Sequence, residues 1–304
     1  MNRKVWAGII LGLALVSLIV VAALGFRGPG IDYHGHAGQA IGIVRVEGII
    51  VGGRSGSFLD ATSAAEDIVD QLRRARKDPA IKAVVIRLDS PGGSAPASLE
   101  IGEEVARVRE AGKVVVASMG DTAASGAYWI AARSNTIVAN PATLTGSIGV
   151  IIQTQRLMGL YDKLGIDTET YKSGPFKDMG SPSRPPTEEE RAIFQGIVDE
   201  MYREFVAVVA NGRGMSLDRV RELADGRVYT GRQAHELGLV DRLGDFEDAV
   251  RLAADMAGVR GEPELVEMST RSPWEELFGG FSSSLAGRAS DGLWLIMDPL
   301  VVQR

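Results

Sequence analysis

The sequence predicts an α/β domain. From Ala40 onward, short runs of β-branched residues alternate with amphipathic helical segments, which is typical of strands covered by helices. Three glycine-containing turns also follow apolar runs, and turns of this kind line the ligand crevice of α/β folds. The chain has 304 residues, 45% of them hydrophobic, so it can bury a full-sized core.

Strands are expected where β-branched and apolar residues cluster, and helices where apolar residues recur on one face. The expected strands are residues 42–46, 83–88, 113–118, 136–139, 148–152 and 168–172. The expected helices are residues 61–77, 97–110, a helix opening near Thr122, 157–164 and 187–211. The last of these has the clearest start, because Thr187 can cap it and three glutamates suit the positive end of its dipole. Shorter helices close the domain by about Val259.

The N-terminus predicts a membrane anchor over residues 1–26. Residues 5–25 contain no charge, and at ~1.5 Å per helical residue they span the ~30 Å of a bilayer core. Arg3 and Lys4 precede this run, which predicts a cytoplasmic N-terminus and an extracytoplasmic remainder at the cell membrane. A cleaved secretory signal is the alternative, but the run exceeds the ~7–15 apolar residues of such signals.

Three further segments follow the anchor. Residues 27–39 are rich in glycine and predict a flexible tether. Residues 40–262 carry the alternating pattern and form the predicted catalytic domain. Residues 263–304 lack that pattern and form a tail that either lacks order or docks a partner.

Composition excludes several kinds of chemistry. The net charge of -6 provides no basic field for nucleic acid, so no nucleic-acid partner is expected. The chain has no cysteine, which excludes a thiol nucleophile and a thiolate metal site. Its three histidines are His34 and His36 in the tether and His235 in a helical stretch. We therefore expect no metal and no cofactor.

Ser125 is the candidate nucleophile. It lies between small residues at the start of a predicted helix, where its hydroxyl is accessible, although a plain N-cap serine has the same pattern. With histidine scarce, the base that such a serine needs is most simply a lysine, which must be buried to be neutral. Lys177 lies in a turn-rich loop beside Phe176, and Lys172 is the competing candidate. The pattern alone favours a solvated surface lysine for both.

Several motifs, in this order, resemble the signal peptide peptidase SppA family in its short, single-catalytic-domain bacterial form. The resemblance covers about residues 41–259 and rests on Asp89-Ser-Pro-Gly-Gly, Ala124-Ser125-Gly126-Ala127-Tyr128, Asn140-Pro-Ala-Thr-Leu-Thr-Gly-Ser147-Ile-Gly-Val, Lys172-Ser-Gly-Pro-Phe-Lys177-Asp-Met-Gly-Ser-Pro, Gly226-Arg-Val-Tyr-Thr-Gly-Arg and Gly238-Leu-Val-Asp. It implies a Clp-protease/crotonase-like spiral of ββα units, whereas periodicity alone supports only α/β.

The resemblance assigns roles to named residues. It implies that Ser125 is the nucleophile, that Lys177 rather than Lys172 is the general base, and that Ser147 orients this lysine by a hydrogen bond. The two residues would form a serine/lysine dyad that works through an acyl-enzyme.

The resemblance also implies an oxyanion hole. Its donors would be the backbone N–H of Gly92 or Gly93 together with that of Gly126. Ala127 is a departure, since family members commonly have a second glycine there, and its methyl group could narrow the pocket.

The expected function is a membrane-anchored serine endopeptidase that degrades leftover signal peptides and similar apolar peptides. In double-length relatives the nucleophile and the base come from different halves. This chain has a single half's worth of catalytic domain, yet it carries both residues. The expectation is a ring-shaped homo-oligomer with active sites shared between protomers, and a dyad within one protomer is the alternative. The alternatives are a related peptidase that cuts a specific membrane-protein partner, a crotonase-type acyl-CoA enzyme, and an inactive anchored scaffold.

Overall fold

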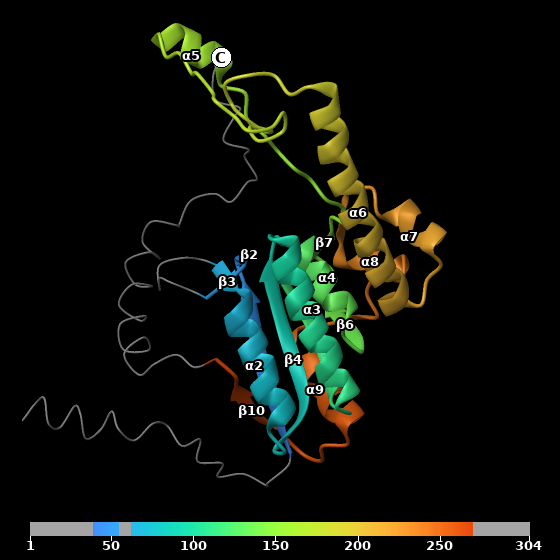
Figure 1. Cartoon of the computed structure of the whole chain (residues 1–304). Helices are drawn as coiled ribbons and strands as arrows, with labels where there is room; N and C mark the ends of the chain where they lie inside the picture. Colours follow the sequence, from blue (N-terminus) through green and yellow to red (C-terminus); the bar gives the residue numbers. More distant parts are fainter. Residues whose placement is uncertain (1–38, 55–61, 270–304) are drawn as a thin grey trace, which may run out of the picture. The chain divides into compact units, whose positions relative to one another are not determined.

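Eight strands form the main sheet of the computed structural model, which describes residues 39–54 and 62–269 (Figure 1). The main path runs in the order β10-β1-β4-β5-β6-β9. The bounds of these strands are β1 Ala40–Glu47, β4 Ile81–Ser90, β5 Val114–Ala124, β6 Thr136–Ala139, β9 Arg242–Leu243 and β10 Glu264–Glu267. All neighbours on this path are parallel, and helices connect several of them, so the predicted α/β class is confirmed.

Two further strands extend this sheet beside β5. β7 (Leu144–Gly146) pairs parallel with the end of β5, where Ala123 lies opposite Thr145 and Ala124 opposite Gly146. β8 (Val228–Thr230) then pairs antiparallel with β7. This extension continues the pairing of β5 to its last residue, immediately before Ser125.

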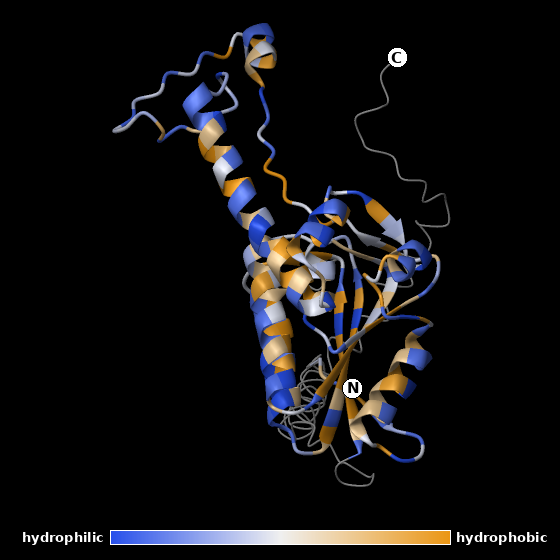
Figure 2. Ribbon diagram, turned by 90° about the vertical axis from the view of Figure 1, so that its right-hand side faces the viewer, coloured by the Kyte–Doolittle hydropathy of each residue, from blue (hydrophilic) through white to orange (hydrophobic). Residues whose placement is uncertain are grey.

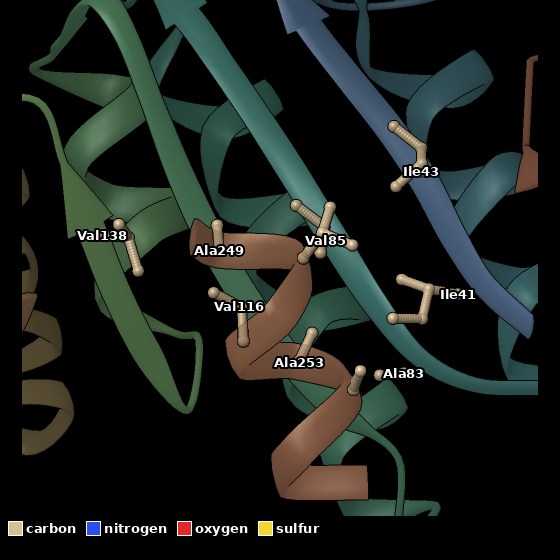
Figure 3. Packing of buried hydrophobic residues seen from close by; sticks show 10 residues of the cluster. Ile41, Ile43, Ala83, Val85, Val116, Val138, Ala249 and Ala253 are labelled. Atoms are coloured by element: carbon tan, nitrogen blue, oxygen red, sulfur yellow. The ribbon is translucent and has the colours of Figure 1, made fainter. Parts of the chain in front are cut away.

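Helices cover both faces of the sheet. On one face, α9 (Phe246–Ala257) packs Ala249 and Ala253 against Ile43, Val85 and Val116 of three neighbouring strands (Figure 3). α2 (Ala65–Lys77), α3 (Ala95–Glu110) and α4 (Gly126–Ala132) cover the other face (Figure 1). The strands are thus buried on both sides, which explains their nearly continuous apolar sequences.

The long helix α6 (Glu188–Arg213) begins as predicted. The Thr187 hydroxyl accepts the N–H of Glu190 at 3.2 Å, and the Glu190 carboxylate accepts the N–H of Thr187 at 2.9 Å. This reciprocal pair is a capping box, and it makes the start of the helix a well-defined anchor. The C-terminal part of α6 is buried and is followed by α7 (Leu217–Leu223) and α8 (Gly231–Glu236).

Several predicted boundaries are wrong. No helix opens near Thr122, because β5 continues to Ala124 in order to pair with β7. Residues 62–64, predicted as helical, form β3 (Thr62–Ala64), which pairs with β2 (Ile49–Val51) in a second sheet. Residues 148–152 and 168–172 are not strands, since no neighbouring strand pairs with them. Residues 264–267 of the predicted tail join the main sheet as β10.

The β7–α6 segment, defined as residues 150–187, differs from the rest of the described chain because it contains no buried residue. Its one helix is α5 (Met158–Leu164). Hydrophobic residues nevertheless recur along its ribbon (Figure 2). Ile151 is 79% exposed and Tyr171 is 86% exposed. The described residues therefore leave this apolar surface uncovered.

The predicted anchor (residues 1–26) and most of the predicted tether (27–39) lie outside the described residues. Within residues 39–54 and 62–269, no helix is both long enough and apolar enough to cross a bilayer.

Candidate active site

Ser125 occupies a strained turn between a strand and a helix. β5 ends at Ala124 and α4 begins at Gly126, so Ser125 alone makes the connection, with φ 53° and ψ -118°. Its N–H donates to the carbonyl oxygen of Gly146 at 2.9 Å, and its carbonyl oxygen accepts the N–H of Trp129 at 3.0 Å. A residue other than glycine at positive φ costs about 1–3 kcal/mol and is characteristic of functional sites.

A second turn packs directly against Ser125. It follows β4 and contains Gly92 and Gly93, both at positive φ (101° and 156°). A β-carbon added to Gly92 would lie 2.8 Å from the Ser125 Cβ and 2.8 Å from the Gly126 nitrogen. One added to Gly93 would lie 2.1 Å from the Ile50 carbonyl oxygen. Only glycine allows this close approach of the backbone to the serine.

The N–H groups beside Ser125 differ in whether they are already used. The Gly92 N–H donates to the Ser90 hydroxyl at 3.0 Å. Within the described part of the chain, the N–H groups of Gly93 and Gly126 have no hydrogen-bond acceptor. A β-carbon added to Gly126 would lie 3.5 Å from the Gly93 nitrogen, so the two glycines are close neighbours. Two unused donors therefore lie next to the serine.

Buried hydroxyls of two further serines shape this site, and sequence reasoning missed both. Ser90 fixes the Gly92 turn, and its place in the Asp-Ser-Pro-Gly-Gly motif was the available signal. Ser98 of α3 donates to the Ser94 carbonyl oxygen at 2.9 Å, and its hydroxyl oxygen would lie 2.2 Å from a β-carbon on Gly126. Ala127 is fully buried, so its methyl group packs in the interior rather than lining an open pocket.

Ser147 lies at the end of the strand next to β5. It directly follows Gly146, whose carbonyl accepts the N–H of Ser125, and its own φ is 47°. The Ser147 N–H donates to the Arg227 carbonyl oxygen at 2.8 Å. Its hydroxyl has no hydrogen-bond partner among the described residues. Ser125 and Ser147 thus follow the paired ends of β5 and β7.

Lys177 lies on the exposed β7–α6 segment and is itself exposed. Its N–H donates to the Gly174 carbonyl oxygen at 3.3 Å. Across residues 39–54 and 62–269, no hydrogen bond or ion pair is formed by its ammonium group. The structure therefore gathers Ser125, Ser147 and the three glycines, and it shows no contact of Lys177 with either serine.

The competing Lys172 is already engaged. Its ammonium group lies 2.7 Å from Asp178 Oδ1 and 3.1 Å from the Pro175 carbonyl oxygen. Arg184 binds the same carboxylate. The hydrogen bonds from Arg184, and after them the hydrogen bond from Lys172, hold the pKa of Asp178 well below its ordinary value. Lys172 therefore has a partner within the loop.

Comparison with known proteins identifies the family. The chain matches Peptidase family S49 over residues 107–260. It is 36% identical to a putative signal peptide peptidase SppA of Enterococcus faecium, over 94% of this chain and 89% of that protein. The chain belongs to peptidase family S49. It is also 42% identical to the putative protease slr0021 of Synechocystis, over 76% of this chain and 79% of that protein.

Further relatives agree with this assignment. Protease 4 of Salmonella typhi is 38% identical over 73% of this chain, which spans 35% of that longer protein. Among solved structures, the S97A mutant of the 1510-N membrane-bound stomatin-specific protease aligns with a TM-score of 0.50 at 14% identity. The alignment covers 78% of this chain and all of that one, and it shows a shared fold.

The S49 assignment confirms the predicted resemblance and makes the chain a serine peptidase. It does not support the acyl-CoA alternative. Across the described ranges, no group of three or more acidic or histidine residues is arranged to hold a metal ion.

Proposed function

We propose that this S49 peptidase is a membrane-anchored serine endopeptidase that uses a serine/lysine dyad to degrade leftover signal peptides and similar apolar peptides. The observation that carries the proposal is the surroundings of Ser125. A strained serine lies next to two unused backbone donors, in a chain whose family consists of peptidases. Anchoring by residues 1–26 would keep the enzyme at the membrane in which such peptides remain.

The proposed reaction has two steps. Neutral Lys177 takes the proton of the Ser125 hydroxyl as its oxygen attacks the substrate carbonyl carbon, and the lysine then gives this proton to the leaving amine. The same lysine next activates a water molecule, which hydrolyses the acyl-enzyme and frees Ser125. In both steps negative charge develops on the substrate oxygen.

We assign the stabilisation of this charge to the N–H groups of Gly93 and Gly126. Gly92 is the weaker candidate because its N–H already donates to Ser90. Donors that face the developing oxyanion matter most when they are pre-arranged and unused, and loss of one typically costs 10²–10³-fold in rate.

The exposure of Lys177 supports a site shared between protomers. A lysine accepts a proton only when it is neutral, and removal from water is what favours the neutral form. Residues 39–54 and 62–269 leave Lys177 exposed, so in the proposed mechanism another surface covers it. Exposed apolar residues on the same segment, including Ile151, Leu164 and Tyr171, fit such a contact. We therefore propose a ring in which Lys177 of one protomer meets Ser125 of its neighbour, with Ser147 orienting the lysine.

Peptide digestion tests the function. The full chain in detergent micelles is incubated with synthetic signal peptides and with matched-length hydrophilic peptides, and the products are identified by mass spectrometry. We expect internal cleavage of the apolar peptides, preferred at least tenfold in kcat/KM, and none by Ser125→Ala. Equal cleavage of both peptide sets would refute the proposed substrate class.

Mixed assemblies test the shared dyad. Ser125→Ala and Lys177→Met chains with different affinity tags are co-expressed, and assemblies carrying both tags are isolated. Sites shared between protomers should regain a fraction of wild-type activity, because some interfaces pair two intact residues. Doubly tagged assemblies without activity would show that the dyad belongs to one protomer.

The proposed topology is tested separately. Protease added outside cells with a permeabilised outer layer should digest the domain that follows residue 26 and leave the N-terminus protected. Protection of the whole chain would contradict an extracytoplasmic domain.

A further inference from the structure

Four charged side chains form a continuous chain between the Lys177 loop and the start of α6. Lys172 and Arg184 both bind the carboxylate of Asp178, and Arg184 also binds the carboxylate of Glu190. We call these four residues the charge clamp. Asp178, in the centre of the clamp, is the residue next to Lys177 in the sequence.

Arg184 holds Asp178 at three points. Its Nε donates to Oδ2 at 2.8 Å and its Nη2 donates to Oδ1 at 2.8 Å, so both carboxylate oxygens are bound in a forked arrangement. Nη2 also lies 3.3 Å from the backbone carbonyl oxygen of Asp178. The guanidinium thus fixes both the side chain and the backbone of the neighbour of Lys177, which a point charge could not do equally well.

The guanidinium of Arg184 also binds the first turn of helix α6. Its Nη1 donates to Glu190 Oε2 at 2.9 Å, and its Nη2 donates to Glu190 Oε1. The Glu190 side chain is only 1% exposed and accepts the N–H of Thr187 in the capping box of α6. Arg184 therefore connects the Lys177 loop to the first turn of a 26-residue helix.

Few other contacts among the described residues hold this loop. The Leu157 N–H donates to the Pro182 carbonyl oxygen at 2.8 Å, and Gly180 lies beside Phe194 of α6. The β7–α6 segment has no buried residue, so no hydrophobic core holds it. Its backbone hydrogen bonds near Lys177 are local turns, from Lys177 to Gly174 and from Met179 to Phe176. Isolated surface ion pairs contribute little, but a forked, networked arrangement with one nearly buried member is the exception to that rule.

We infer that Arg184 is a positioning residue of this peptidase. It fixes the position of the Lys177 backbone relative to α6 and thereby orients the Lys177 side chain. The inference rests on the proposed role of Lys177 as the base. It also gives Lys172 a function, since this lysine helps to hold Asp178 and does not take part in proton transfer.

Kinetics of the full chain provide the first test. Arg184→Met should lower kcat about 10- to 100-fold, the size of effect expected when a catalytic group is misplaced by ~1 Å, with KM changed less than twofold. Arg184→Lys keeps the charge but not the fork, so it should fall between Met and wild type. Arg191→Met is the matched control, because this α6 arginine binds none of the four clamp residues. It pairs with the exposed Glu188 at 3.2 Å and lies 3.5 Å from the Pro186 carbonyl oxygen, so its loss should leave kcat at the wild-type value.

A spin label at position 177 provides a readout independent of catalysis. The chain has no cysteine, so Lys177→Cys can be labelled at that site alone. The label should become more mobile in the Arg184→Met background and stay unchanged with Arg191→Met. Unchanged label mobility, or wild-type kcat for Arg184→Met, would overturn the inference. Wild-type activity of Lys177→Met would instead show that the proposed base is wrong, whatever the label reports about the clamp.

Discussion

Replacing Gly126 by alanine tests the packing that holds this proposed oxyanion donor beside Ser125. The added β-carbon would lie 2.2 Å from the Ser98 hydroxyl oxygen and 3.2 Å from the Ser98 Cβ. Gly126 does not have a positive φ, so the expected cost is steric and not conformational. Overpacking of a buried site costs about 1–3 kcal/mol in the free energy of unfolding. The shift that relieves the clash should also move the Gly126 N–H and lower kcat.

The second change in this test removes the atom that Gly126→Ala would meet. Ser98→Ala deletes the hydroxyl and its 2.9 Å bond to the Ser94 carbonyl, a loss of about 0.5–1.5 kcal/mol. The Ser94 carbonyl keeps the N–H of Ser98 at 3.0 Å, so no buried acceptor is left unpaired. In the double variant the 2.2 Å contact is gone, and only the 3.2 Å contact needs a small adjustment.

The double variant should therefore be about as stable as Ser98→Ala alone and should regain most of the kcat that Gly126→Ala loses. Denaturant unfolding of all four proteins, with kcat measured on one apolar peptide, forms a double-mutant cycle. Independent effects would instead make the double variant the least stable, by about 1.5–4.5 kcal/mol relative to wild type. That additive result would refute the steric explanation.

Three other predictions concern the serine, the lysines and the clamp. Ser125→Ala and Ser125→Gly should both abolish peptide hydrolysis. In denaturant unfolding, the glycine variant should have a free energy of unfolding about 1 kcal/mol higher than the alanine variant, because glycine tolerates the φ of 53°. Equal stability of the two variants would argue against strain at this position. Lys177→Met should be inactive in peptide assays. Lys172→Met should stay largely active, because Arg184 still holds both carboxylate oxygens of Asp178. The reverse order of activities would identify Lys172 as the base. Hydrogen bonds from Arg184 lower the pKa of Asp178 and of Glu190, so the clamp stabilises the loop fully above pH ~4, the ordinary pKa of a carboxyl group. Its contribution decreases below that pH and is lost as the pH falls through the lowered pKa values of the folded chain. Pepsin nicking of residues 172–187, normalised to an unfolded peptide, should therefore rise as the solution is acidified, and a flat profile would contradict this.

The sequence correctly predicted those helix and strand boundaries that are set by neighbouring residues in the chain. The capping pattern at Thr187 located the start of α6, and the apolar run at residues 136–139 matches β6 (Thr136–Ala139). The predicted end of β5 was wrong. The actual end is set by pairing with β7, a contact between residues about 22 positions apart that no local pattern records.

In the candidate site, too, some residues have a local sequence signal, whereas others are found only in the three-dimensional structure. Glycine-rich turns after strands indicated that Gly92, Gly93 and Gly126 line a crevice, and the family resemblance added their oxyanion role, which stays a prediction. The structure places glycine where it is needed, at positive φ for Gly92 and Gly93 and in close contact with Ser98 for Gly126. The choice between Gly92 and Gly93 depends on where the Ser90 hydroxyl points, and only a three-dimensional structure gives this. Arg184 was missed for a related reason, since an arginine in a turn-rich loop has no signature until its two carboxylate partners are seen around it.

The two halves of the proposed dyad are held by different physical means. Ser125 directly follows the paired end of β5, and the backbone around it approaches so closely that a β-carbon on Gly92 or Gly93 would clash. Lys177 is exposed and is positioned through charged side chains on a segment without a buried residue. A base of this kind gains its neutral form only where another surface removes water from it. Proton transfer would then depend on assembly, and an unassembled chain would hold a preformed nucleophile without a competent base.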